Sequence, residues 1–103
     1  MRYPKKQNIY GVSYTVEVKD DLIEKYSATG LFNWKEKKIQ LQKGMDVETG
    51  QKTYLHECFH GVLHRLGIDV LLSSEMNELI VDSIATFCTE EKKNLISVLS
   101  NKK

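Results

Sequence analysis

The chain alternates between apolar and polar residues over 12–19, where the sequence reads VSYTVEVK. Successive side chains of a strand point to opposite faces of a sheet, so this alternation predicts a strand that is buried on one face. Two further strand-like stretches, at 31–34 and 38–42, flank the polar residues Lys35, Glu36 and Lys37, which predicts a hairpin. We therefore expect about three strands in a small antiparallel sheet.

Apolar residues recur with the period of a helix in two later stretches. The first helix is expected to begin between residues 46 and 51 and to end at Gly67. The second is expected to begin at Ser73 or Ser74 and to run toward Leu99, burying its apolar face. The apolar loop between them is expected to pack and to let the helices lie side by side. The sheet and the two helices together predict an α+β fold.

The 103 residues are expected to form one domain, 1–103, with its core at about 9–99. Lys and Arg number 15 against 14 Asp and Glu, a balance that does not favour nucleic acid or an anionic membrane as a partner. No stretch has the pattern of a signal peptide or a membrane span. Two cysteines, Cys58 and Cys88, are too few for a disulfide scaffold, so we expect buried reduced thiols in a cytoplasmic protein.

All three histidines lie in the sequence TYLHECFHGVLH. One arc of about 100° on a helical wheel holds the polar residues Thr53, His56, Glu57, His60 and His64. The apolar residues of the same stretch fall on the rest of the wheel. This helix is therefore expected to have an apolar back and a front that carries the histidines.

His56 and His60 lie one turn apart and can direct two imidazoles at a single tetrahedral ion, about 2.0–2.1 Å from each nitrogen. Glu57 projects beside them, where its carboxylate can take a proton from a bound water and return it to a leaving amine. This H-E-x-x-H arrangement predicts one zinc ion, with Glu57 as the catalytic base. The alternative is an amphipathic helix that merely carries histidines on its solvent side, and the uninterrupted polar arc favours zinc.

Catalytic zinc usually has three protein ligands and one open position, so a further ligand is expected. The second helix carries Glu75, Glu78 and Asp82 on one face. We expect Glu78 as the third ligand, with Glu75 as the alternative, and Asp82 as a hydrogen-bond acceptor for a ligand imidazole. His64 lies about 12 Å from His56 along the helix axis, too far to share the ion, so we expect it at the pocket edge or in solvent.

The motif HECFH, followed by NELIVD, resembles the gluzincin pattern of metallopeptidases. A larger part, over about 12–88, is similar to the short ImmA/IrrE-type metallopeptidase domains of bacteria, prophages and mobile elements, in GLFNWKEKKIQLQ, TYLHECFHGVLH and ELIVDSIATFC. The resemblance implies a minimal zincin-like fold, with zinc on His56, His60 and Glu78 and with Glu57 catalytic. It also implies a protein or peptide substrate, such as a repressor or regulator.

One feature departs from the thermolysin-type pattern, and another excludes a related class. No histidine follows His64, so the histidine with which thermolysin-type enzymes stabilise the oxyanion is missing. Zinc would supply most of that stabilisation, with Tyr26 or Tyr54 as candidate pocket residues that assist. Leu63 and Leu66 stand where metzincins need Gly and His, which excludes that class.

Three functions are compatible with these residues. The first is a zinc endopeptidase of narrow specificity, whose extended substrate would add to the strand at 38–42 if that strand is a sheet edge near the metal. The second is a binding or regulatory protein that keeps the zinc fold and has little hydrolytic activity. The third is an interaction module that binds no metal.

Overall fold

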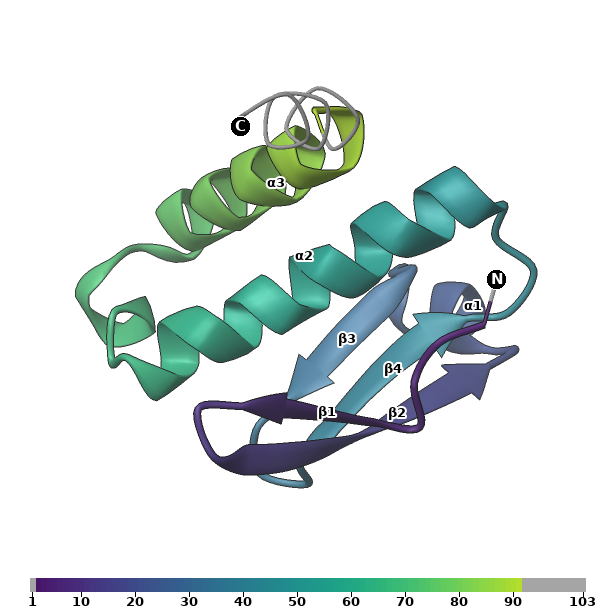
Figure 1. Ribbon diagram of the computed structural model, residues 1–103, viewed down its shortest axis with the longest axis horizontal. Helices are drawn as coiled ribbons and strands as arrows, with labels where there is room; N and C mark the ends of the chain where they lie inside the picture. The colour runs from purple at the N-terminus through teal and green to yellow at the C-terminus, as the bar shows by residue number, and fades with distance from the viewer. Residues whose placement is uncertain (1, 92–103) are drawn as a thin grey trace, which may run out of the picture.

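The computed structural model describes residues 2–91, and its two long helices lie on one side of a single sheet (Figure 1). The elements in chain order are β1 (Lys6–Ile9), β2 (Val12–Lys19), α1 (Leu22–Tyr26), β3 (Gly30–Asn33), β4 (Lys38–Gln42), α2 (Val47–Arg65), the 3-10 turn η1 (Asp69–Leu71) and α3 (Ser74–Glu90). The α+β class, the hairpin and the two long helices are thus confirmed. The expected continuation of helix and core toward Leu99 lies outside the described residues.

The sheet is mixed and has four strands in the order β1-β2-β4-β3. The outer pairs, β1 with β2 and β3 with β4, are antiparallel, whereas the central strands β2 and β4 run parallel. The expectation of about three antiparallel strands is therefore wrong. After β2 the chain passes through α1 and returns in β3 with the opposite direction. The hairpin turn reverses the chain once more, so β4 enters the sheet parallel to β2.

β1 is the strand that the hydrophobic pattern did not reveal. Its sequence KQNI is mostly polar, and only Ile9 is buried. Tyr10 and Gly11, which join β1 to β2, both have positive φ (48° and 85°), as in the type I′ turn of a tight hairpin. The Gly11 N–H also donates to Asn8 Oδ1 at 2.9 Å. The tight turn, rather than an alternation of apolar and polar residues, accounts for this fourth strand.

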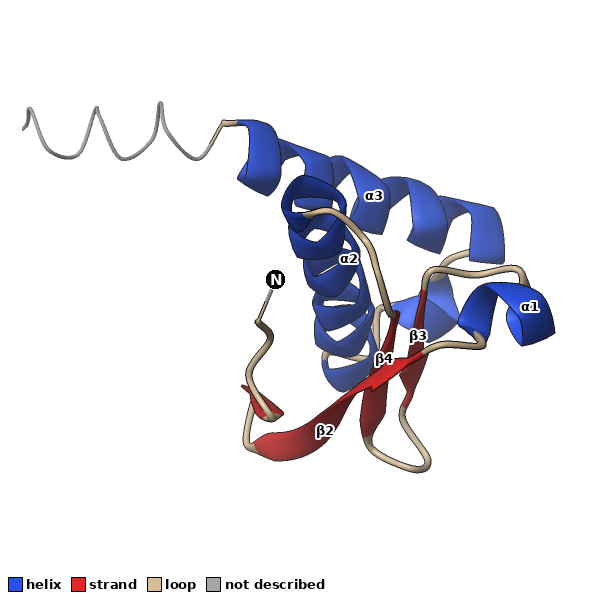
Figure 2. Ribbon diagram, turned by 90° about the vertical axis from the view of Figure 1, so that its right-hand side faces the viewer, coloured by secondary structure: helices blue, strands red, loops and turns tan. Residues whose placement is uncertain are grey.

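The core lies between the sheet and α2 (Figure 2). Tyr14 of β2 and Ile39 and Leu41 of β4 are almost completely buried there. α2 lies close to the sheet at Gly61, where an added Cβ would lie 2.6 Å from Ile9 Cδ1. A side chain at that position would require Ile9 to move, so the glycine allows α2 to pack this closely on the sheet.

α3 packs against α2 on the side away from the sheet (Figures 1 and 2). Only Val81 and Ala85 of this helix are fully buried. Met76 (45%), Ile84 (40%) and Phe87 (53%), which belong to the apolar face that was expected to be buried, are exposed. That expectation is wrong because α3 has one principal neighbour among the described elements, so it buries a narrow stripe rather than a broad face. No helix among residues 2–91 is long and apolar enough to cross a membrane.

The turn between the long helices reverses the chain as expected, but only Ile68 and Leu72 of its apolar residues are partly buried. Val70 and Leu71 are 81% and 79% exposed. The turn is held by polar contacts instead, because the Asn77 side-chain amide donates to the carbonyl oxygens of Asp69, Leu72 and Ser73. Both cysteines are free and only partly buried, at intermediate exposure, so full burial of these thiols is not borne out.

Candidate metal centre

Two helix starts fix the positions of the candidate ligands. The Asp46 side chain accepts the Thr49 N–H at 3.2 Å and begins α2, which then continues without a break through the histidines. The Ser73 side chain accepts the Met76 N–H at 3.1 Å and begins α3. Because the turn sends α3 back along α2, Glu78 faces the histidine side of α2.

His56, His60 and Glu78 meet at one point. The two Nε2 atoms lie 3.2 Å apart, and the Glu78 oxygens lie 3.0 Å from His56 Nε2 and 2.9 Å from His60 Nε2. Atoms that bind one tetrahedral ion at about 2.0–2.1 Å lie about 3.3 Å from one another. The three donors are therefore slightly closer than a shared ion requires, and a small outward movement of each would admit one.

This donor group can hold a metal ion, since its three ligand atoms all lie within 4.8 Å of one another. The imidazole side chains are 19% and 21% exposed, whereas that of Glu78 is 61% exposed, so the group opens to solvent on the α3 side. Burial lowers the pKa of His60. A ligand imidazole must be neutral, so this shift favours metal binding.

Glu57 lies beside the donor group but on the sheet side of α2. The residue is 7% exposed, and burial, followed by the negative charge of Glu78, raises its pKa to about 8. Its carboxyl group contacts β3 so closely that a Cβ added to Gly30 would lie 2.9 Å from Glu57 Oε2 and 2.8 Å from Thr53 Cγ2. A cation in the donor group would favour the ionised form of this carboxyl.

Asp82 is directed at the outer nitrogen of a ligand imidazole, although it does not reach hydrogen-bond distance. Its Oδ1 atom lies 3.7 Å from His56 Nδ1 and 3.8 Å from Lys52 Nζ. Distances of this size are typical of ion pairs, whereas hydrogen bonds to nitrogen are about 2.7–3.2 Å long. The expected hydrogen bond from His56 to Asp82 is therefore absent, and Asp82 contributes its charge.

Three other candidates lie away from this group. Glu75, the alternative third ligand, is exposed in the first turn of α3. Tyr54 faces β1, where its hydroxyl donates to Gln7 and burial raises its pKa. Tyr26 is 58% exposed on α1. None of the three lines the cavity that contains the donor group, so the structure gives neither tyrosine a position from which to assist there.

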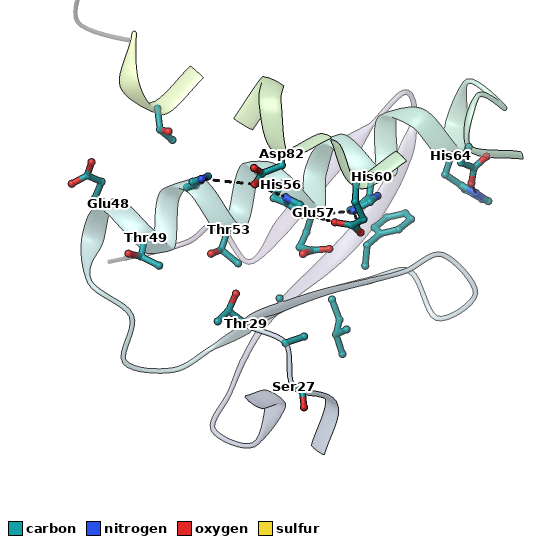
Figure 3. Close-up of a pocket in the computed structure, with 18 of the residues that line it drawn as sticks. Ser27, Thr29, Glu48, Thr49, Thr53, His56, Glu57, His60, His64 and Asp82 are labelled. Atoms are coloured by element: carbon teal, nitrogen blue, oxygen red, sulfur yellow. Dashed lines mark hydrogen bonds and ion pairs between the residues drawn. The ribbon is translucent and has the colours of Figure 1, made fainter. Parts of the chain in front are cut away.

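The donor group lies in an elongated cavity of about 950 Å³. Along α2 its wall runs from Glu48 through the two ligand histidines to His64, and Thr29 and Ser27 lie across from them (Figure 3). The wall opposite α2 includes Gly30 and Phe32 of β3. His64 thus lies at one end of the cavity, as expected for a pocket-edge residue.

β3, and not β4, is the sheet edge beside this cavity. The strand at 38–42 was considered as a docking edge, but β4 is a central strand between β2 and β3. Gln42 N–H donates to the Thr29 carbonyl at 2.8 Å, and bonded and non-bonded positions alternate in an antiparallel pair. The main-chain groups of Gly30 and Phe32 therefore point away from β4, toward the edge that no described strand covers.

Sequence reasoning also missed two partners of the site. His64 Nδ1 lies 3.0 Å from Asp69 Oδ2, and Trp34 stacks on the His64 ring. Asp69 follows His64 by five residues, and the reversal at Gly67 (φ 74°) brings it back. A glycine that ends a helix, followed two residues later by an acid, was the available signal.

No protein-family model, curated protein or solved structure matches this chain. What the protein does must therefore be inferred from the residues that meet at the donor group.

Proposed function

We propose that the protein is a zinc-dependent metallopeptidase with a minimal zincin-like fold, similar to the ImmA/IrrE-type domains, that hydrolyses peptide bonds of a specific protein substrate. The observation that carries the proposal is the meeting of His56, His60 and Glu78 at a single point, with the Glu57 carboxyl group beside them. Two imidazoles and one carboxylate make up a ligand set of catalytic zinc. The proposed substrate is a regulatory protein such as a repressor.

Bound zinc would polarise the substrate carbonyl and make water acidic enough to ionise near neutral pH. Glu57 would accept a proton from the attacking water while the water oxygen bonds to the carbonyl carbon. As the C–N bond breaks, Glu57 would return that proton to the leaving nitrogen, so that the products are a carboxylate and an amine. Glu57 is buried, so bulk water does not compete for its carboxyl group.

The edge of β3 supports an extended substrate. The N–H and C=O groups of Gly30 and Phe32 point away from β4 and can pair with a peptide main chain, as in strand addition to a sheet edge. Gly30 adjoins Glu57. A peptide paired there would bring its carbonyl groups close to the catalytic carboxyl and the donor group.

Metal content and cleavage together test this proposal. Elemental analysis of the purified chain is expected to find one zinc per chain that a chelator removes, and His60→Ala should lose both zinc and cleavage of a proteome-derived peptide pool. Glu57→Gln should keep zinc and lose cleavage, because the amide cannot accept a proton. Absence of zinc from the wild-type chain, or undiminished cleavage by Glu57→Gln, would contradict the proposal.

An alternative function is a zinc-binding regulatory or protein-interaction module with little hydrolytic activity. The exposed apolar residues of α3 favour it, since Leu79 and Phe87 are 61% and 53% exposed and form no part of the cavity. For such a module, Glu57→Gln should leave function unchanged, while removal of zinc should unfold the chain.

A further inference from the structure

We propose that the end of the cavity at His64 is a pocket for a large apolar or aromatic side chain of the substrate, close to the bond that is cut. The inference rests on the proposed peptidase function and adds the substrate class that this site selects. It depends on Trp34, His64 and Phe32, which the hydrolytic chemistry does not use.

Three rings form this end of the cavity. The Trp34 and His64 rings are stacked, with centroids 5.1 Å apart and planes 24° apart. The Phe32 and His64 ring centroids lie 6.1 Å apart, with planes 57° apart. Phe32 also packs on Tyr14 of the core, with ring centroids 5.2 Å apart. Ring faces and edges at these separations attract a further aromatic or apolar group. Trp34 is 52% exposed, so a side chain that covered it would remove apolar surface from water.

The His64 ring is held in place rather than free to turn. Its Nδ1 atom is 3.0 Å from Asp69 Oδ2, and the Asp69 backbone carbonyl accepts the Asn77 amide at 3.0 Å. The imidazole therefore has its orientation set by the turn between α2 and α3. A fixed ring wall binds a flat or bulky side chain at a smaller entropy cost than a mobile one.

The pocket lies close to the proposed reaction centre. His64 is one turn beyond His60 on α2, which is about 6 Å. Side chains on one face of an extended peptide recur about every 6.6 Å. A substrate residue in the pocket would therefore lie within about two residues of the cleaved bond. The wall from Glu48 to His64 measures about 24 Å at 1.5 Å per residue, the length of about seven extended residues.

Charges around the cavity favour an apolar side chain over a basic one at this end. Lys35 Nζ already lies 5.6 Å from the Trp34 ring centroid, and it would repel a second cation there. Asp69 is the carboxylate at this end, and its Oδ2 atom is already engaged by His64 Nδ1 at 3.0 Å. Carboxylates of Glu48, Asp82 and Glu90 line other parts of the cavity and would draw a basic side chain away from the rings. The two ends of the cavity thus differ in the chemistry that they can bind.

Cleavage preference is the first test. Zinc-loaded wild-type protein is incubated with a proteome-derived peptide pool, and the cut sites are read by mass spectrometry. Phe, Tyr, Trp, Leu or Met is expected to be enriched at one position within two residues of the cut, by about tenfold or more over Ala. Trp34→Ala and His64→Ala should each abolish this enrichment. Phe87→Ala, which changes an exposed aromatic outside the cavity, should keep it.

Binding supplies a second test that needs no catalysis. Zinc-loaded Glu57→Gln protein is immobilised and exposed to a random seven-residue peptide pool, and the retained peptides are sequenced. Aromatic and large apolar residues should be enriched at one position of the retained peptides. This enrichment should disappear when Trp34→Ala is combined with Glu57→Gln. Trp34 is the only tryptophan in the chain. Retained peptides should therefore shift its fluorescence and shield it from acrylamide.

The outcomes separate this inference from the proposed function. Capture of aromatic peptides without any cleavage by the wild type would refute the peptidase and support the pocket. Cleavage with a preference for Lys or Arg, or a preference that Trp34→Ala and His64→Ala leave intact, would refute the pocket and support the peptidase. Neither cleavage nor capture would refute both.

Discussion

α2 and α3 both contribute to the donor group, but their surroundings differ. α2 lies between the sheet and α3 (Figure 2), and it packs on the sheet so closely that a Cβ added to Gly61 would lie 2.6 Å from Ile9 Cδ1. α3 rests mainly on α2, and half or more of Leu79 and Phe87 remains exposed. The two imidazoles therefore come from a helix that is packed on both sides, and the carboxylate comes from one that is packed on one side. A metal that joins them should hold α3 more than it holds α2.

Removal of the metal should have the largest effect on the difference between α2 and α3. Zinc at 100 times its dissociation constant adds about 2.7 kcal/mol to the free energy of unfolding. Because α3 depends more on the metal, a chelator should reduce amide hydrogen-exchange protection in α3 more than in β4 or the middle of α2. Mass-spectrometric exchange with zinc and with chelator measures this. His60→Ala, as control, should not respond to zinc, and an equal loss of protection throughout the chain would contradict the comparison.

The stability of the metal-free chain should depend on pH through Glu57, on the sheet side of α2. Burial raises the pKa of Glu57 from 4.5 to about 8. Between these values the unfolded metal-free chain releases this proton and the folded chain keeps it, so stability falls as pH rises. The contribution is fully present below about pH 4.5 and lost by about pH 8, and it amounts to roughly a few kcal/mol. Urea unfolding with chelator should show this fall.

Glu57→Gln is the matched variant for this measurement, since the amide has a similar shape and does not titrate. Its stability in chelator should change less between pH 5 and pH 8 than that of the wild type. If both proteins lost the same free energy of unfolding over this interval, Glu57 would not be the group responsible.

Gly30→Ala tests how closely α2 packs on the sheet, at its contact with β3. The new Cβ would lie 2.8 Å from Thr53 Cγ2 and 2.9 Å from Glu57 Oε2, so these side chains, or the helix that carries them, must shift. Overpacking of this kind costs about 1–3 kcal/mol. Thermal or urea unfolding should show this loss, along with weaker cleavage. Thr29→Ala, at the exposed neighbouring residue, should stay within about 0.5 kcal/mol of the wild type.

Asp82→Asn should have the smallest effect, on the α3 side. Asp82 Oδ1 lies 3.7 Å from His56 Nδ1, beyond a hydrogen bond, so only its charge supports the imidazole. Loss of an outer partner typically weakens metal binding about 10–100-fold, and we expect the lower end of that range. Competition with a chromogenic chelator gives the affinity. Ser83→Ala, an exposed neighbour on α3, serves as control, and a loss beyond about 100-fold would indicate a direct ligand.

The sequence predicted the histidine side of α2 well, because helix geometry fixes which residues share a face. His56, His60 and Glu57 needed only an unbroken helix, and the capped start at Asp46 supplies one. The position of Glu78 followed from a second helix running back along the first. These features depend on local periodicity and one reversal, which the chain encodes within short stretches.

Features that depend on strand order were not accessible in this way. Nothing in the alternation of 38–42 tells whether that strand is central or at an edge, and the structure places it in the centre. The apolar loop residues Val70 and Leu71 likewise gave no sign that they would be exposed. Residue composition shows what could be buried, but the number of neighbouring elements decides what is buried.

The continuity of α2 carries a consequence for the tolerance of this chain to insertions and deletions. Each residue added or lost within a helix rotates everything beyond it by about 100°. One insertion or deletion between Thr53 and His64 would turn some of the polar residues on the histidine side of α2 into the core or into contact with α3. The bends at 34–37 and 66–73 could absorb a change in length. Length variation in related chains should therefore be concentrated in those bends.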